Sequence, residues 1–473
     1  MKVLLYNWVS YDDEKTRGGG VTVYLKNLIK YLQNNKKDID ITFLHSGSYY
    51  DIYDRTLRYE LVDNCIECKN YAIVNSPVFA PAYLSFPQVD TVLEDVELKD
   101  VFIKFLEENG PFDVVHFHNL EGLSLKVLEI KSLFPKIKFI YTLHNYYAFC
   151  PQVNLWRKES ICCKKNNTDE ECIECMRWHV PFEKLRYKMA MTYTLCKRND
   201  EKLRNAYKEC GRKLDEYFRE EEFGQLKDSD KIQRSFIRYR REFVDIINKN
   251  IDIVLGVSQR VCDIANEMGI EKQKIRVAYI GTQIAEQTKK PSDIKMNDEV
   301  IELIYLGYRR KDKGYFFLLD VLETLPDFVA KRIAVTIAAK TLPDYPDREI
   351  NKSRFKRFEV YDGYERESLE ELLKGKHLGI VPVLWEDNLP QVAIEMVALG
   401  VPIITSNRGG ASELGNNELF QFEAENVEEC CEKIKFFVEN PEKLQDFWRN
   451  SMELVTMDKH LEELLKIYNE EKG

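Results

Sequence analysis

Apolar and polar positions in the segment 378–405 follow the pattern of a strand, a helix and a second strand. The almost unbroken apolar run 378–384 indicates a strand that is buried on both faces. Apolar residues then recur at helical spacing, at Leu389, Val392, Ala393, Met396 and Val397. Gly400 and Pro402 end this helix, and 401–405 predicts the next strand. The segment is therefore a βαβ unit, typical of an open parallel sheet.

Two carboxylates flank the start of this predicted helix. Asp387 follows the carboxyl end of the strand, where open parallel sheets bind ligands. Glu395 lies about two turns into the helix, on a different side from the apolar stripe. The first backbone N–H groups of the helix, in 389–392, would point at an anion lying there. The arrangement fits a nucleotide-sugar, which has a diphosphate between two hydroxylated rings. The same spacing also fits an N-terminal acid and a solvated helix face.

The segment resembles the donor-binding signature of retaining glycosyltransferases of family 4. Asp387 takes the place of the first acid of that signature and Glu395 that of the second. The other residues that fall in step are Asn388, Leu389, Pro390, Gly400, Pro402, Gly409, Gly410 and Glu413. The chain departs from the signature because its first acid is Asp instead of Glu and a small glycine between the acids is absent. Both changes alter the space around the donor sugar.

The resemblance implies an α/β fold of the GT-B type, in which two Rossmann-like domains face each other. It also implies transfer of a sugar from a nucleoside-diphosphate sugar, with a UDP-sugar as the expected donor, to a hydroxyl acceptor. Asp387 is then expected to hold the donor-sugar hydroxyls and Glu395 the ribose hydroxyls. The helix start, including Gln391, is expected to receive the diphosphate. The resemblance further implies that catalysis needs no cofactor and no divalent metal.

Glycines and histidines in the first half of the chain extend the resemblance. Gly19 and Gly20 precede a helical stripe and match a family loop that faces the donor diphosphate. His118, after the predicted strand 114–117, matches a histidine that reaches the donor sugar, so we expect a hydrogen-bonding group there that can also carry a proton. Taken alone, the glycine turn is a weak signal and His118 also fits a structural histidine. His144 ends the next strand and is expected to lie on the acceptor side or to be structural.

A run of cations follows the predicted strand 301–306. In the family, an Arg and a Lys at this point neutralise the diphosphate leaving group, and Lys313 aligns with that Lys. Tyr308 occupies the Arg position, so we expect Arg309 to substitute for it, since its planar guanidinium can bind two phosphate oxygens. The alternative is a solvated loop.

The length of 473 residues predicts two domains. We expect a first, acceptor-side domain over 1–250 with an insertion at 150–250, and a donor-binding domain over 251–450. The residues 451–473 are expected to form a helix that packs back on the first domain.

Composition and charge indicate a globular protein that does not bind nucleic acid. Hydrophobic residues make up 44% and charged residues 31% of the chain, and no apolar run approaches the roughly 18 residues of a membrane span. The amino terminus lacks the pattern of a signal peptide, so we expect a cytoplasmic location. The net charge of −10 disfavours nucleic acid.

One segment carries the opposite charge from the chain as a whole. The segment 177–241 contains 18 Lys and Arg against 11 Asp and Glu, a net charge of +7. The wider helix-prone region 181–250 is therefore either a solvated helical insertion or a surface for an anionic acceptor or the inner membrane face.

Five cysteines lie close together in the sequence, at Cys150, Cys162, Cys163, Cys172 and Cys175. Cys172 and Cys175 form a C-x-x-C chelating pair, and two of the upstream cysteines can complete a tetrahedral site. We therefore expect a structural zinc held by four of the five. Free thiols, an iron–sulfur cluster or a redox disulfide are the alternatives.

Two other functions remain open from the sequence. The first is a nucleotide-sugar epimerase or hydrolase of the same architecture, which needs no acceptor. The second is a non-catalytic scaffold that binds a nucleotide-sugar. The acceptor can be a glycan, a lipid-linked precursor or a protein, and polysaccharide or glycoconjugate assembly at the cell surface is the expected context.

Overall fold

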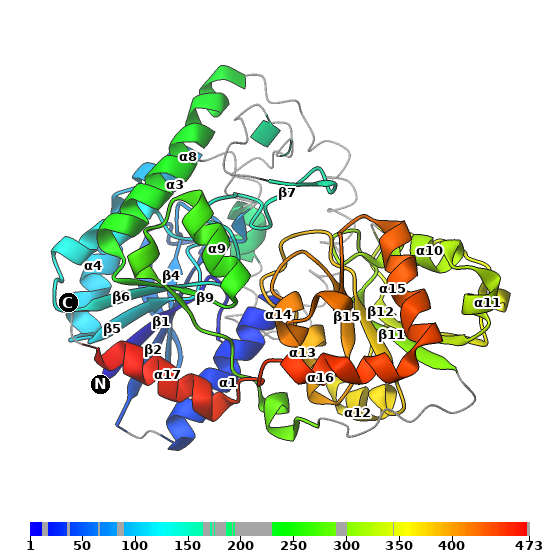
Figure 1. Ribbon diagram of the computed structural model, residues 1–473. Coiled ribbons are helices and arrows are strands. Elements are labelled where there is room, and N and C mark those ends of the chain that lie inside the picture. The colour runs from blue at the N-terminus through cyan, green and yellow to red at the C-terminus, as the bar shows by residue number, and fades with distance from the viewer. Residues whose placement is uncertain are drawn as a thin grey trace.

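The computed structural model describes residues 1–11, 18–35, 38–64, 67–82, 89–163, 171–172, 175, 186–191, 193, 229–289, 300–343 and 345–470. These residues form two α/β domains that lie side by side, each with its own parallel sheet (Figure 1). The expected GT-B arrangement of two Rossmann-like domains is therefore confirmed.

The first domain is built on an eight-stranded sheet with the order β10-β9-β6-β5-β1-β2-β4-β3. The strands are β1 (Lys2–Tyr6), β2 (Asp40–Tyr49), β3 (Arg58–Asn64), β4 (Lys69–Val74), β5 (Val114–Phe117), β6 (Lys138–Leu143), β9 (Ile253–Gly256) and β10 (Ile275–Val277). All neighbours pair in parallel except β3 and β4. The central strands β5 and β6 are buried along their whole length, as is typical of inner strands of a parallel sheet that helices cover.

Helices cover this first sheet. They are α1 (Gly19–Asn35), α3 (Val89–Glu94), α4 (Glu97–Asn109), η2 (Leu125–Ser132), α8 (Ser229–Asn250), α9 (Gln259–Met268) and η3 (Lys272–Lys274). Helix α9 shows how the sequence sets its own limits. The Ser258 side chain accepts a hydrogen bond from the Val261 N–H at its start, and Gly269 ends it in the left-handed region at φ 111°.

The second domain has a six-stranded, wholly parallel sheet with the order β13-β12-β11-β14-β15-β16. The strands are β11 (Ile301–Tyr308), β12 (Ile333–Lys340), β13 (Arg357–Tyr361), β14 (Leu378–Val381), β15 (Ile403–Ser406) and β16 (Gln421–Phe422). The α-helices are α10 (Tyr315–Thr324), α11 (Asp327–Ala330), α12 (Leu369–Leu373), α13 (Gln391–Ala398), α14 (Ser412–Gly415), α15 (Val427–Glu439) and α16 (Phe447–Asn450). The last helix, α17 (Met457–Asn469), belongs with the first domain. The short 3₁₀ turns are η4 (Gln283–Gln287), η5 (Lys352–Arg354), η6 (Arg366–Ser368), η7 (Glu418–Phe420) and η8 (Pro441–Asp446).

The expected start of the second domain at residue 251 differs from the structure. Strand β9 pairs with β6, and β10 pairs with β9, so both strands extend the first sheet. The second sheet receives its first strand only at β11. A parallel strand joins whichever sheet edge is open to it, and the order of elements along the chain does not reveal which edge that is.

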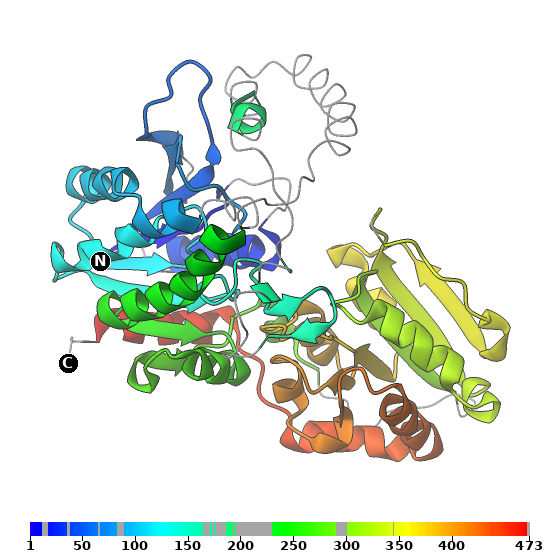
Figure 2. The ribbon, with the colours of Figure 1, turned by 90° about the horizontal axis from the view of Figure 1, so that it is seen from above.

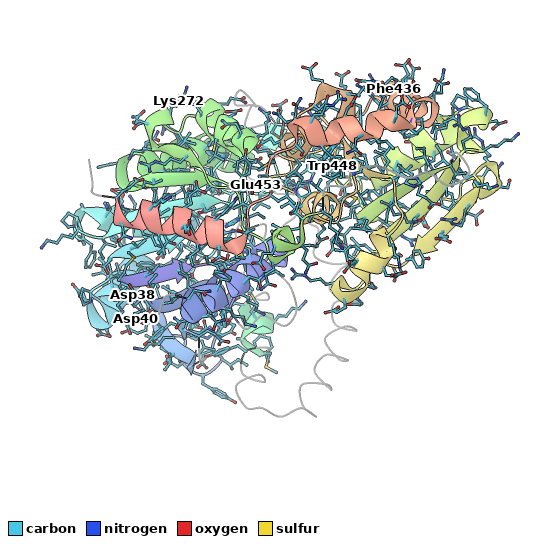
Figure 3. The ribbon with its side chains drawn as sticks, turned by 60° about the horizontal axis from the view of Figure 1, so that its bottom comes forward. Asp38, Asp40, Lys272, Phe436, Trp448 and Glu453 are labelled. Atoms are coloured by element: carbon cyan, nitrogen blue, oxygen red, sulfur yellow. The ribbon has the colours of Figure 1, made fainter. Side chains whose placement is uncertain are left out.

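The chain returns to the first domain at its end. Trp448 lies on the second domain, Glu453 at the junction, and α17 beside the first domain (Figure 3). Thr282 and Thr456 form a parallel bridge at this crossing. Helix α17 then packs on α1, and the Tyr24 hydroxyl lies 2.7 Å from Nε2 of His460.

A short hairpin, β7 (Trp156–Arg157) with β8 (Ile161–Cys162), reaches from the first domain to the junction with the second (Figure 2). Glu159 at its tip forms an ion pair with Lys311 at 3.3 Å. The Cys162 thiol donates a hydrogen bond to the Leu384 carbonyl at 3.4 Å. Of the basic region 181–250, the structure describes only 186–191, 193 and 229–250, so the charge pattern expected there lies largely outside the described residues.

Across the part of the chain that the structure describes, we find no helix of the length and apolarity that crossing a bilayer requires.

The contact between α17 and the first domain is apolar, which makes its contribution to stability testable. Leu464 is 1% exposed within the cluster that α17 shares with α1. We predict that Leu464→Ala lowers the free energy of unfolding by about 2–5 kcal/mol, because it leaves a cavity in a packed core. Glu462→Ala, on the exposed face of the same helix, should change it by less than about 0.5 kcal/mol. Equal denaturant midpoints for the two variants would show that α17 is not docked as described.

Candidate functional site

A cavity of about 430 Å³ lies between the two domains. The first domain contributes the lining residues Gly20, Val21, Tyr24, His144, Val257 and Ile280. The second domain contributes, among others, Tyr308, Lys313, Tyr364, Trp385, Asp387 and Glu395. The cavity opens at the carboxyl ends of strands from both sheets, where open parallel sheets bind their ligands.

The start of α13 forms one wall of this cavity. Strand β14 ends at Val381, earlier than the apolar run suggested, because Pro382 has no N–H to continue a ladder. Pro390 is the N-cap of α13, and Gln391 is its first residue. The residues 387–392 all line the cavity, so the first N–H groups of the helix, which lack intrahelical partners, lie at its wall.

Lys313 and Asp387 form an ion pair on the cavity wall. The Lys313 ammonium lies 2.5 Å from a carboxylate oxygen of Asp387 and 5.2 Å from the centre of the Trp385 ring. The Asp387 side chain is 10% exposed and that of Lys313 27% exposed. The pair therefore places one cation and one carboxylate beside the start of α13.

Glu395 lies farther along the same helix and also lines the cavity. The Tyr364 hydroxyl donates a hydrogen bond to it at 3.0 Å. Burial raises the pKa of the Glu395 carboxyl above its usual value, although the Tyr364 hydrogen bond acts in the opposite direction. Sequence reasoning missed Tyr364. The only signal was its place just after the strand 357–361, at the carboxyl edge of the sheet.

Arg309 does not line the cavity. Its guanidinium forms an ion pair with Asp347 at 2.7 Å and donates to the Ala339 carbonyl at 3.1 Å. Its side chain is 9% exposed and lies over the Tyr315 ring. Tyr308, at the position where the family has Arg, does line the cavity. The expectation that Arg309 replaces that Arg is therefore not supported, because Asp347 draws the guanidinium away from the cavity.

The histidine that lines the cavity is His144, and His118 lies behind it. His118 is fully buried, and its Nδ1 lies 3.2 Å from Nε2 of His144. Burial lowers the pKa of His144 to about 3, with nearby His460 adding to the effect, so its ring is neutral near pH 7. His116 is held between Tyr468 and Thr142, at 2.7 Å from each, and is a packed structural histidine.

The residue after His144 is Asn145, and its surroundings favour an amide over a carboxylate. The Asn145 amide donates a hydrogen bond to Glu121 at 2.8 Å. Glu121 is a fully buried carboxylate that also accepts hydrogen bonds from Asn119 and from the Ala82 N–H. A second carboxylate at position 145 would place two negative charges side by side, whereas the amide supplies the donor that Glu121 needs.

The glycine turn before α1 faces α13 across the cavity. Gly20 lines the cavity, and a Cβ added there would lie 3.4 Å from the Gln391 side chain. Gly19 adopts φ 55°, in the left-handed region that favours glycine, and does not line the cavity. The amino ends of two helices, one from each domain, therefore approach the same space.

The five cysteines do not form the expected zinc site. Among the described residues, which include all five, no group of three or more His, Cys, Asp or Glu side chains is arranged to hold a metal ion. The Cys162 thiol faces the Leu384 carbonyl, and Arg240 donates a hydrogen bond to the Cys172 sulfur at 2.8 Å. Burial, with Cys150, Cys172 and Cys175 nearby, raises the pKa of Cys163 to about 12.

Comparison with curated proteins gives two relatives that align with part of the chain. An uncharacterized 41.2 kDa protein in the cps region of Klebsiella pneumoniae is 26% identical over 236 residues, which cover 47% of this chain and 63% of that protein. Spore coat protein SA of Bacillus subtilis is 26% identical over 155 residues, which cover 30% of this chain and 40% of that protein. The chain thus spans less than two thirds of the length of each relative.

Comparison with solved structures extends over the whole chain. HepE of Anabaena in complex with UDP superposes with a TM-score of 0.56 at 12% identity, covering 99% of both chains. HepE has also been solved with UDP-glucose. At this identity the likeness shows the shared fold of two domains.

A comparison with protein-family models gives a match in the second domain, which contains α13, Asp387 and Glu395. Residues 286–453 match the family "Glycosyl transferases group 1". The matched range begins in η4, ahead of β11, and ends near the junction, so it contains the whole second sheet. The second domain of this chain is therefore similar to the family glycosyl transferases group 1.

Proposed function

We propose that this protein is a retaining glycosyltransferase that moves a sugar from a nucleoside-diphosphate sugar, with UDP as the expected nucleotide, to a hydroxyl acceptor. The observation that carries the proposal is the interdomain cavity, in which a helix start and a lysine are flanked by Asp387 and Glu395. The group 1 match of the second domain supports the same conclusion.

The diphosphate binds at the start of α13 in this proposal. The backbone N–H groups of Leu389, Gln391 and Val392 and the ammonium of Lys313 offer hydrogen bonds and positive charge to its oxygens. Negative charge grows on the diphosphate as the bond to the sugar breaks. A cation held in place by Asp387 and Trp385 stabilises that charge without further rearrangement. These protein groups take the role that a divalent metal has in other sugar transferases, so catalysis is expected to be metal-independent.

The carboxylates of Asp387 and Glu395 bind different parts of the donor in this proposal. Asp387, next to Lys313, lies where it can accept hydrogen bonds from donor-sugar hydroxyls. Glu395 faces the other side of the helix start, where it accepts from ribose hydroxyls while Tyr364 keeps its carboxylate oriented. HepE, which shares the fold, has been solved with UDP, and that complex supports the choice of nucleotide.

His144 takes the role that the sequence suggested for His118. It lies on the first-domain wall of the cavity, opposite Asp387, and its neutral ring can donate or accept a hydrogen bond. His118 contacts its Nε2 from behind and so influences which ring nitrogen carries the proton. We assign His144 to the sugar or to the acceptor hydroxyl, and His118 to orienting His144.

The acceptor is proposed to approach from the first domain. The proposed acceptor is a glycan, a lipid-linked precursor or a protein, and activity assays with each class will distinguish them. Peripheral membrane contact through 181–250 is part of the same proposal. The relative in the cps region of Klebsiella pneumoniae supports polysaccharide assembly as the first context to examine.

The role of Lys313 gives the first test. We predict that Lys313→Ala lowers kcat by about 10²- to 10³-fold, because removing one preorganised charge-stabilising group from an active site has that effect. Turnover is measured as UDP release in the presence of an acceptor extract, with circular dichroism to verify folding. Lys311→Ala is the matched control, since the Lys311 ammonium pairs with Glu159 outside the cavity and its loss should change kcat by less than about twofold. Unchanged turnover in Lys313→Ala would contradict the assignment.

The role of His144 gives a second test, with a pH dependence. We predict that His144→Ala lowers kcat by about 10- to 100-fold through the loss of one buried hydrogen bond, while UDP affinity stays unchanged. The folded-state pKa of His144 is lowered to about 3, so its ring stays neutral down to pH values near that pKa. The ratio of wild-type to His144→Asn activity should therefore be constant between pH 6 and 9. A ratio that changes near pH 6.5 would show that a protonated imidazole takes part.

A further inference from the structure

Glu386, the residue before Asp387, carries a buried carboxylate whose main partner belongs to the other domain. Its side chain is 6% exposed. Arg260, in the first turn of α9 in the first domain, reaches it with two nitrogens, Nε at 3.0 Å and Nη2 at 2.8 Å. The Gly409 N–H donates to the same carboxylate at 3.0 Å. A bidentate guanidinium contact of this kind fixes both the position and the orientation of the carboxylate.

A second carboxylate of the second domain caps the amino end of α9. Glu413 accepts hydrogen bonds from the backbone N–H groups of Gln259 at 3.0 Å and Arg260 at 2.8 Å. The Tyr279 hydroxyl of the first domain donates to it at 2.7 Å. These N–H groups are among those that a helix cannot satisfy internally, so Glu413 stabilises α9 only while the two domains are in contact.

The loop that contains Asp387 is packed between these two contacts. The Ser258 hydroxyl donates to the Asn388 carbonyl at 2.8 Å, and the Asn388 amide donates to the Leu143 carbonyl at 3.3 Å. A Cβ on Gly409 would lie 2.0 Å from the Asp387 carbonyl oxygen. A Cβ on Gly410 would lie 2.4 Å from the Asn388 carbonyl oxygen. The loop therefore has no room to shift toward the second domain.

The position of the Asp387–Asn388 loop depends on Arg260, because Arg260 neutralises the buried charge of Glu386. Burial by itself would raise the pKa of Glu386, but the hydrogen bonds and charge of Arg260 outweigh it and hold the pKa below the usual value. Arg408 is a second cation near this carboxylate, with one contact at 3.4 Å. Without Arg260, Glu386 would have to become protonated or move toward water, because a buried carboxylate without sufficient partners is strongly destabilised. Either change alters the contacts that hold the loop carrying Asp387 in place.

We propose that Arg260 is a positioning residue of the donor site, which acts from the first domain through Glu386 on the Asp387–Asn388 loop of the second. Arg260, Glu386 and Glu413 together form a latch between the domains, and the donor site is complete only while this latch is closed. The proposal rests on the proposed function of the cavity, since it concerns the geometry of the residues that bind the donor. Nothing in the signature acids themselves indicates a requirement for a first-domain arginine.

Substitution of Arg260 tests the latch. We expect Arg260→Met to lower kcat/KM for the donor by about 100-fold, the effect of a displacement of about 1 Å at a reacting centre. Arg260→Lys, which keeps the charge but loses the two-point contact, should recover part of that loss. Arg276→Met is the matched control, because Arg276 is also a first-domain arginine in an ion pair, with the exposed Glu470 at 2.6 Å, away from the cavity. Activity of Arg260→Met within about twofold of that control would overturn the proposal.

Two further measurements separate positioning from general destabilisation. Glu386→Gln should lower kcat/KM for the donor as well. The double variant Arg260→Met, Glu386→Gln should have a kcat/KM no lower than that of the less active single variant, because both substitutions remove the same contact. Strictly additive losses would overturn the latch.

Small-angle X-ray scattering tests the latch independently of enzymatic activity, because it measures how far apart the two domains lie. Arg260→Met should have a larger radius of gyration than the wild-type chain, and Arg276→Met an equal one. If the wild-type chain transfers no sugar, the proposed function fails, and scattering alone decides on the latch. Equal radii for all three proteins would then overturn it.

Discussion

Glu386 has almost no access to water, and its negative charge is balanced by a guanidinium that the other domain supplies. A buried charge is tolerated only with close partners, so this pair constrains how the domains can lie. The neighbouring Asp387 shares the constraint, since Gly409 packs directly on its backbone and the Gly410 N–H donates a hydrogen bond to its carbonyl at 2.9 Å. In the proposed latch, the pairing of Asp387 with Lys313 and the placing of His144 on the facing wall of the cavity depend on this contact.

The cavity joins two kinds of structure with different physical roles. The second domain provides fixed charge, from the start of α13, Lys313 and two carboxylates. The first domain provides neutral groups, from Gly20, Tyr24 and His144, whose ring stays uncharged because it is buried. Such a division suits a reaction in which charge develops on one half of the substrate while an uncharged hydroxyl arrives from the other side.

Much of the fold could be predicted from the sequence, and the reasons for the exceptions are physical. The buried strands and the helices at 259–268 and 391–398 follow from apolar spacing, serine capping and glycine termination. The sheet that receives β9 and β10 could not be predicted, since the apolar pattern of a buried strand does not specify its neighbours. The second-domain site residues 387–391 and Glu395 do line one cavity. Arg309 and His118 do not line the cavity. Arg309 is held by Asp347, and His118 lies behind His144. Both partners are distant in sequence, so only the fold reveals these contacts.

The central claim is that the interdomain cavity binds a nucleoside diphosphate through the start of α13 and Glu395. Calorimetric titration of UDP into the wild-type chain and Glu395→Gln, each with and without a metal chelator, tests it most directly. We predict one UDP per wild-type chain regardless of chelator, and affinity lower by about tenfold in Glu395→Gln, where hydrogen bonds to a charged acceptor are replaced by weaker ones. Equal affinity in the two proteins, or no binding of UDP to the wild-type chain, would contradict this account of the cavity.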